Sequence, residues 1–137
     1  MNKIKKLALI TGGTKGLGKC LAFELAKQNY DIWAIFKNDI DAARACKKEF
    51  NDKGMFFECI KFNIDGDKAL DIKFLEDYNK IILIHNACDR FSPSKFHNID
   101  LIDYRKQMET TFFSTVKLMQ TLIKPLNKNK SDIVFIL

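Results

Sequence analysis

Short apolar runs with the length of buried strands recur five times along the chain. They are Lys6–Thr11, Asp31–Phe36, Met55–Phe62, Lys80–Asn86 and Asp132–Leu137. Between them lie stretches whose apolar residues recur at i, i+3 and i+4, the spacing of a helix with one buried face. These are Gly16–Gln28, Asp39–Asn51, the shorter segment Asp67–Tyr78, and Asp100–Ile123.

Strands that alternate with helices predict an α/β fold with a parallel sheet and right-handed crossovers. The run Lys80–Asn86 is almost wholly apolar, as expected for a central strand covered on both faces. We expect loop over Asp89–Asn98, and we expect Pro125 and the polar stretch Asn127–Ser131 to end the last helix. A length of 137 residues predicts a single domain, residues 1–137, with one core.

Four of the six glycines lie at positions 12, 13, 16 and 18, directly after the first predicted strand. Glycine allows positive φ angles and lets a backbone approach a ligand closely. The helix that follows begins at this turn, and the free N–H groups and dipole at a helix N-terminus attract phosphate. The sequence therefore predicts a nucleotide-binding turn.

Two phosphate-binding motifs fit the same residues. Gly13–Lys19 matches the first seven positions of the P-loop pattern G-x-x-x-x-G-K-[ST], but the eighth position holds Cys20. A thiol is a poor ligand for Mg²⁺. The strand Lys80–Asn86 also ends in His85-Asn86, without the acidic residue that a P-loop protein would need. A P-loop NTPase is therefore the remote alternative.

The other pattern, Thr11-Gly12-x-x-x-Gly16-x-Gly18, resembles the cofactor turn T-G-x-x-x-G-x-G of the short-chain dehydrogenase/reductase family. Asn63-Ile64 follows the third strand, where that family commonly has Asp-Val beside the adenine ring. His85-Asn86-Ala87-Cys88 ends the fourth strand, where the family has N-N-A-G.

The resemblance extends to the end of the chain. Tyr104–Pro125 is similar to the family's long fourth helix, and Ser131–Leu137 is similar to its fifth strand. The resemblance implies a Rossmann-like, three-layer α/β/α fold whose parallel sheet has the strand order 3-2-1-4-5. It also assigns a set of residues to a bound dinucleotide. They are Gly12, Thr14, Lys15, Gly16, Leu17, Gly18, Lys37, Asn63, Ile64, Asn86 and Ala87.

The end of the second strand favours NADP over NAD. An acidic residue there would accept hydrogen bonds from the ribose 2′-OH of NAD, but the strand ends in Lys37-Asn38. Lys15 and Lys37 together suit a 2′-phosphate. We expect Asp39 and Asp41 to begin the second helix, as its cap and as a first-turn residue.

The family transfers hydride between a nicotinamide and a carbonyl or alcohol, using an Asn, a Ser and a Tyr-x-x-x-Lys pair. By resemblance, Thr111 stands at the Asn position and the other three residues would follow Leu137. Tyr104 and Tyr78 do not substitute, because neither is followed four residues later by lysine. We therefore expect dinucleotide binding without turnover, or alternatively a non-catalytic module that docks a partner.

Two matched positions depart from the family pattern, Thr111 in place of Asn and Cys88 in place of the glycine of N-N-A-G. Cys88 places a side chain where backbone usually approaches the cofactor. We expect His85 to be a packed or hydrogen-bonded residue rather than a catalytic base. The apolar edge Ile133–Leu137 carries no charge, so we expect self-association, or a complementary chain, along this strand and the fourth helix.

Composition narrows the remaining classes. The net charge of +6 comes from lysines spread along the chain, which predicts a solvated surface rather than a nucleic-acid site. The spacing of the four cysteines and two histidines predicts no metal site and no disulfide framework. No apolar run approaches the ~20 residues of a membrane span. The start is too short in apolar residues for a signal peptide, so a cytoplasmic protein is expected.

Overall fold

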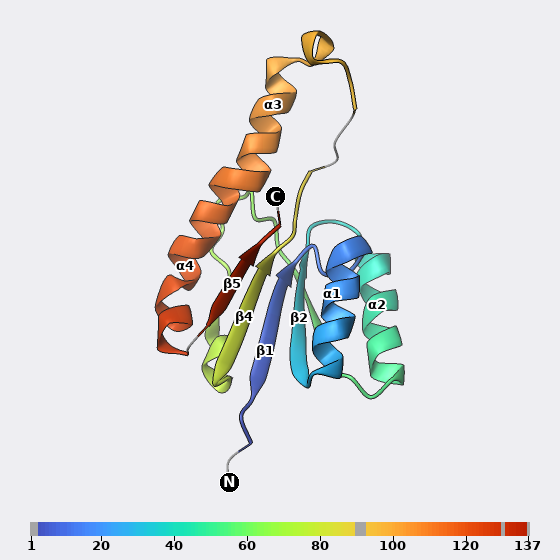
Figure 1. Cartoon of the computed structure of the whole chain (residues 1–137), viewed down its shortest axis with the longest axis vertical. Coiled ribbons are helices and arrows are strands. Elements are labelled where there is room, and N and C mark those ends of the chain that lie inside the picture. Colours follow the sequence, from blue (N-terminus) through green and yellow to red (C-terminus); the bar gives the residue numbers. More distant parts are fainter. Residues whose placement is uncertain (1–2, 90–92, 130, 137) are drawn as a thin grey trace.

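The computed structural model describes residues 3–89, 93–129 and 131–136, and its centre is a five-stranded parallel sheet (Figure 1). The order along the sheet is β3-β2-β1-β4-β5, which confirms the predicted topology. The strands are β1 (Lys6–Thr11), β2 (Tyr30–Phe36), β3 (Phe57–Lys61), β4 (Lys80–His85) and β5 (Asp132–Phe135). Leu137, the predicted end of the fifth strand, and residues 90–92 of the predicted loop lie outside the described residues.

Helices cover both faces of the sheet, giving the expected three layers (Figure 1). One face packs against α1 (Gly16–Lys27) and α2 (Ile40–Asp52), which begin and end within one residue of the predicted bounds. The other face packs against α4 (Ser114–Lys128) and the short 3₁₀ helix η1 (Lys73–Asp77).

The two cores meet at β1, whose side chains alternate between them because successive residues of a strand point to opposite faces. Leu7 and Leu9 belong to the core under α4, whereas Ala8 and Ile10 belong to the core under α1 and α2. All four are completely buried. The apolar run of β1 is therefore explained by burial on both faces, as in a central strand of a parallel sheet.

The last helix continues through Pro125, so the prediction that this residue ends it is wrong. Proline lacks the N–H that would bond to the carbonyl one turn earlier, and in a helix interior this costs about 3 kcal/mol. Leu126, the next residue, is 2% exposed and packs in the core with Leu122. Burial of a leucine contributes about 1.5–3 kcal/mol, which largely offsets the loss and holds the final turn on the sheet.

The predicted long helix 100–123 is not uniform. It consists of α3 (Leu101–Met108), a π-helical segment (Glu109–Phe113, η3) and α4. A π segment carries an additional residue per turn and so shifts the buried face. The buried residues are Thr110, Ser114, Leu118, Leu122 and Leu126.

The buried apolar face expected along the first half of this helix is wrong, because α3 has no buried residue. Leu101, Met108 and Phe112 are half exposed or more, and Tyr104 is also exposed. α3 extends beyond the ends of the strands, where there is no sheet for it to cover (Figure 1).

The segment Asp67–Tyr78 forms only the five-residue η1, not the expected longer helix. Its buried residues, Leu70, Leu75 and Tyr78, are spaced by five and three positions and do not keep the i, i+3 and i+4 spacing of an α-helical face. The Asp71 carboxylate also accepts the N–H of Lys73 at 3.1 Å, a local bond that competes with helix formation. A second short 3₁₀ helix, η2 (Phe96–Asn98), lies within the predicted loop.

The packing of α4 predicts a large difference between two leucine truncations. Leu122 is fully buried and Leu101 is 69% exposed. We expect Leu122→Ala to lower the free energy of unfolding by about 2–5 kcal/mol and Leu101→Ala to change it by less than about 0.5 kcal/mol. Urea denaturation followed by circular dichroism measures both, and equal losses would contradict the assignment of Leu122 to the core.

Candidate functional site

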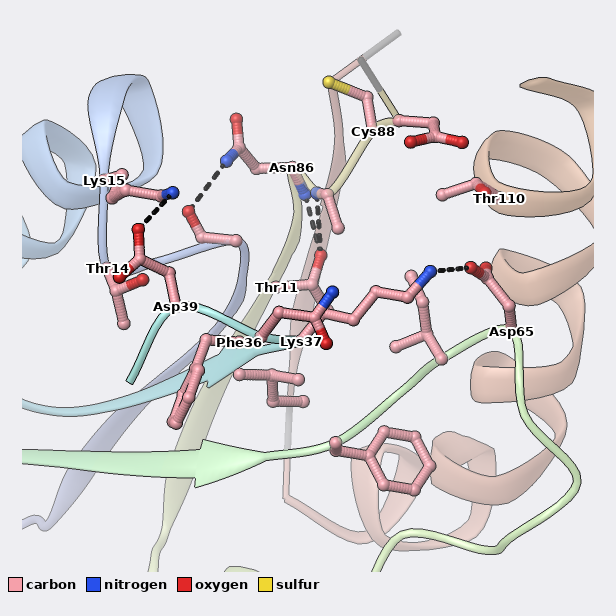
Figure 2. A pocket seen from close by; sticks show the side chains of 17 residues that line it. Thr11, Thr14, Lys15, Phe36, Lys37, Asp39, Asp65, Asn86, Cys88 and Thr110 are labelled. Carbon is pink, nitrogen blue, oxygen red and sulfur yellow. Dashed lines mark hydrogen bonds and ion pairs between the residues drawn. The ribbon is translucent and has the colours of Figure 1, made fainter. Parts of the chain in front are cut away.

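A cleft of about 600 Å³ opens at the carboxyl ends of β1, β2 and β4 (Figure 2). The chain leaves β1 toward one face of the sheet and leaves β4 toward the other. The cleft therefore lies at the point where the strand order reverses, which is the usual ligand site of open α/β sheets. It is lined by Thr11, Gly12, Thr14, Lys15, Ile35, Phe36, Lys37, Asn38, Asp39, Phe62, Ile64, Asp65, Asn86, Ala87, Cys88, Asp89 and Thr110.

The glycine turn packs against the start of α1 so closely that a side chain would not fit. A Cβ atom on Gly18 would lie 2.2 Å from the carbonyl oxygen of Gly12. Gly12 itself has φ +66° and Gly16 has φ +53°, a region that L side chains rarely adopt. Lys15 precedes α1 in an extended conformation, and no described side chain caps the helix there. The N-terminus of α1 is therefore open to an anion.

The hydroxyl of Thr11 fixes the spacing between β1 and β4. Thr11 Oγ1 accepts the backbone N–H groups of Asn86 and Ala87, each at 3.0 Å. Its own hydrogen is then directed at Nδ1 of His85, 3.1 Å away. The side chain of Asn86 completes the junction, because its amide donates to the carbonyl oxygen of Gly12 at 3.2 Å. The loop after β4 is thus held against the glycine turn.

These bonds assign the tautomer of His85. Nδ1 accepts from Thr11, so the ring hydrogen is on Nε2, which donates to Thr115 Oγ1 at 2.6 Å. Thr115 donates onward to the carbonyl oxygen of Thr111 at 2.7 Å. His85 is 1% exposed, and burial lowers its pKa. The neutral ring joins β1, β4 and α4, in agreement with the predicted structural role.

Two ion pairs flank the cleft. Lys15 Nζ lies 2.8 Å from Asp39 Oδ2, and Lys37 Nζ lies 2.8 Å from Asp65 Oδ2 (Figure 2). Asp39 also accepts the N–H of Ala42 at 3.0 Å and so caps α2, as predicted. The hydrogen bond from Lys15 lowers the pKa of Asp39. The sequence did not indicate that this capping carboxylate would also face the cleft.

Asp65 is a site residue that the sequence did not reveal. Burial raises its pKa, but hydrogen bonds from Lys37 and Ser114 outweigh burial, so the pKa of Asp65 lies below its ordinary value. Asp65 lies in the loop after β3, whereas its partner Lys37 directly follows β2 and Ser114 begins α4. No local sequence pattern could have indicated that these residues meet.

Seven of the residues assigned to a dinucleotide line the cleft together. They are Gly12, Thr14, Lys15, Lys37, Ile64, Asn86 and Ala87. Gly16, Leu17 and Gly18 form the first turn of α1 beside it. Asn63 is not among the lining residues, and its side-chain oxygen accepts the N–H of Asp65 at 3.2 Å, in a local turn.

The π-helical segment brings Thr110, and not Thr111, to the cleft. Thr110 is 9% exposed and lines the cleft. The hydroxyl of Thr111 bonds back to the carbonyl oxygen of Gln107, and Thr111 lines a different hollow, between α4 and β5. The equivalence of Thr111 to the family Asn stays a prediction from the resemblance.

That second hollow is an apolar groove of about 520 Å³ between α4 and the edge strand β5. Its apolar lining includes Phe112, Val116, Met119, Ile123 and Phe135. Every residue of β5 is exposed, and in the order of the sheet this strand has a neighbour on one side alone. We refer to the groove and β5 together as the α4/β5 surface.

The fold and the cleft define a class of protein. A parallel sheet in the order 3-2-1-4-5, with a glycine turn and an open helix N-terminus at the switch point, is a Rossmann-like nucleotide-binding architecture. The family model described as short chain dehydrogenase matches residues 6–137. The chain belongs to the short-chain dehydrogenase family.

Curated relatives match over part of their length. A 3beta-hydroxysteroid dehydrogenase of Mediterraneibacter gnavus is 34% identical over 86 residues, which is 61% of this chain and 31% of that protein. General stress protein 39 of Bacillus subtilis is 26% identical over 127 residues, which is 89% of this chain and 44% of that protein. The chain therefore spans less than half the length of either relative.

Solved structures share the fold. Acetoin dehydrogenase from Enterobacter cloacae superimposes with a TM-score of 0.77 at 20% identity, over 98% of this chain and 55% of that one. An actinorhodin polyketide ketoreductase with NADPH gives a TM-score of 0.81 at 19% identity, over 96% of this chain and 52% of that one. FolM alternative dihydrofolate reductase 1 from Brucella canis, complexed with NADP, gives a TM-score of 0.78 at 21% identity, over 97% of this chain and 54% of that one.

Residues 3–89, 93–129 and 131–136 contain no group of three His, Cys, Asp or Glu side chains that could hold a metal ion. The same ranges contain no helix with the length and apolar character of a membrane span.

The buried neutral His85 predicts a loss of stability in mild acid. Its native pKa is lowered, whereas in the unfolded chain it is about 6.5. The unfolded state therefore binds more protons as the pH falls from about 7 through 6.5, and the free energy of unfolding decreases. Denaturation at pH 7.5 and 5.5 should show this loss, and His85→Asn should reduce it.

His97, the second of the two histidines in the chain, provides the matched control. It lies on the exposed helix η2, so His97→Asn should leave the pH dependence unchanged. If the free energy of unfolding depends on pH in the same way in wild type and His85→Asn, the assignment of a neutral, buried ring is contradicted.

Proposed function

We propose that this chain binds a nicotinamide dinucleotide in the cleft at the switch point, with NADP preferred over NAD. The observation that carries the proposal is the open N-terminus of α1 behind the glycine turn, with Lys15 and Lys37 lining the same cleft. The pyrophosphate would lie against the first turn of α1, where the N–H groups and the helix dipole favour negative charge. The NADP- and NADPH-bound neighbours of the same fold support this choice of ligand.

The adenosine end of the ligand would lie between β2 and β3. Phe36, Phe62 and Ile64 give this part of the cleft an apolar lining, which suits a purine ring. Both oxygens of Asp39 already have partners, the N–H of Ala42 and the ammonium of Lys15. Asp39 is therefore less available to a ribose 2′-hydroxyl than an unpartnered carboxylate at the strand tip would be.

The 2′-phosphate of NADP would recruit lysines that are already paired. Both ammonium groups are about half exposed, and an exposed ion pair contributes only about 0–1 kcal/mol. A phosphate carries more charge than one carboxylate and accepts charge-assisted hydrogen bonds from several donors. Binding can therefore draw Lys15 and Lys37 toward the ligand at small cost.

We further propose that these 137 residues hold the cofactor without turning it over. The family reaction is hydride transfer between the nicotinamide and a carbonyl or alcohol, and its Tyr-x-x-x-Lys pair has no counterpart in the sequence. A positioned general acid contributes about 10²–10⁴-fold in rate. The function is that of an oxidoreductase's cofactor-binding half, in a protein that we place in the cytoplasm.

A second proposal concerns the α4/β5 surface. Ile133, Val134 and Phe135 on the edge strand are 37%, 42% and 45% exposed. These three residues carry no charge, and an exposed edge without charge favours pairing with another chain. The solved neighbours are nearly twice as long as this chain. We propose that a further polypeptide segment covers this surface, and that the 137-residue chain alone self-associates through it.

The cofactor preference predicts a selective effect of charge reversal. Lys37→Asp should weaken NADPH binding while leaving NADH binding much less affected, because only NADPH carries the 2′-phosphate. Isothermal titration calorimetry with both dinucleotides measures the ratio of affinities. Lys48→Asp, the same change on an exposed part of α2 outside the cleft, is the control. An unchanged ratio of NADPH to NADH affinity in Lys37→Asp would contradict the proposed role of Lys37 in binding the 2′-phosphate. Mg²⁺-dependent binding of ATP would favour the P-loop alternative.

The edge strand predicts a change in assembly. Val134→Lys adds a charge to β5 of the kind that prevents edge pairing in natural sheets, so it should shift the chain toward monomer in sedimentation velocity. Leu101→Lys adds the same charge to an exposed position of α3 and should leave the distribution unchanged. A wild-type chain that sediments as a monomer, with freely exchanging β5 amides, would contradict the proposal.

A further inference from the structure

We propose that Asp65 is a specificity-determining residue of the dinucleotide cleft. In the free protein its carboxylate holds the ammonium group of Lys37, and on binding it competes for that group with the 2′-phosphate of NADP. Asp65 therefore reduces the preference for NADP over NAD. The inference rests on the proposed function, and concerns the tuning of the same site.

The position of Lys37 is the first basis for this inference. Its side chain leaves the end of β2 and runs across the cleft to Asp65, in the loop after β3 (Figure 2). The ammonium and the carboxylate are 2.8 Å apart. The lysine side chain is 51% exposed, whereas the aspartate side chain is 18% exposed. Lys37 is thus the partner that is free to move.

Asp65 is held in place from the side of the last helix. Ser114 Oγ lies 2.8 Å from Asp65 Oδ1. The same hydroxyl also lies 2.6 Å from the carbonyl oxygen of Glu109, which already accepts the backbone N–H of Ser114, so the carboxylate shares the serine hydroxyl with that carbonyl. Thr110 adds a further hydrogen bond. Ser114 and Thr110 therefore keep Asp65 in place when Lys37 leaves.

The charges around the cleft explain why this carboxylate matters. Its lining contains two lysines and three aspartates, at positions 39, 65 and 89, and each lysine is already paired. A 2′-phosphate must therefore draw an ammonium group away from a carboxylate that stays nearby. Both side chains of the ion pair between Lys15 and Asp39 are exposed, so solvent and salt screen their charges well. Less water surrounds the more buried carboxylate of Asp65, so its charge acts more strongly than that of Asp39 on a nearby ammonium or phosphate group.

The test replaces Asp65 by asparagine, which removes the charge and retains an oxygen for Ser114. Isothermal titration calorimetry of the 137-residue chain with NADPH and NADH gives the affinity ratio. We expect Asp65→Asn to raise the NADPH affinity about two- to fivefold, the range set by one partly exposed ion pair, with NADH little changed. Asp67→Asn removes the same charge from an exposed position outside this cleft and should leave the ratio unchanged.

A double-variant cycle tests whether Asp65 acts through Lys37. In a Lys37→Gln background, the gain from Asp65→Asn should fall by at least half. If the gain in NADPH affinity is undiminished, Asp65 repels the phosphate directly, and the proposed competition for Lys37 is overturned. An unchanged or lowered NADPH/NADH ratio in Asp65→Asn alone would overturn the specificity role. If Asp65→Asn does not fold, Asp65→Ser provides the same comparison.

The wild-type titration separates this inference from the proposed function. A wild-type chain that binds neither dinucleotide contradicts the proposed function itself. A wild-type chain that binds NADPH, with a ratio that Asp65→Asn leaves unmoved, contradicts only the role of Asp65.

Discussion

The hydroxyl of Thr11 is the contact on which the site depends. It accepts two backbone N–H groups from the loop after β4 and donates to the buried ring of His85. Because His85 is in turn hydrogen-bonded to Thr115 in α4, one side chain at the end of β1 sets the positions of β4 and α4. The glycine turn, the loop after β4 and the π-helical segment then surround one cleft, and its lining follows from that arrangement.

The cleft is not simply positive, although the protein carries a net charge of +6. Both cleft lysines are engaged by carboxylates, and Asp89 adds a third carboxylate to the lining. The ion pairs contribute little where they are exposed. They make the affinity for a 2′-phosphate depend on the carboxylates as well as on the lysines.

The alternation of strands and helices predicted the parallel sheet, and the resemblance to the family implied its strand order and seven of the residues that line the cleft. Apolar runs mark the strands, and the spacing of Gly12, Gly16 and Gly18 marks the turn. The failures involve long-range packing. Pro125 stays helical because Leu126 is buried, and the π-helical segment that brings Thr110 to the cleft was not predicted. Asp65 was missed because its partners lie 28 and 49 residues away.

Binding of the dinucleotide phosphates at the open N-terminus of α1 can be observed by two-dimensional ¹H–¹⁵N NMR of the chain during titration with NADPH, because each backbone amide reports on its own surroundings. We expect saturable shifts at the amides from Thr14 to Gly18 and at Lys37, with β5 amides unmoved. Binding that shifts other amides and leaves the glycine turn unchanged, or the absence of any saturable shift, would contradict binding at this site.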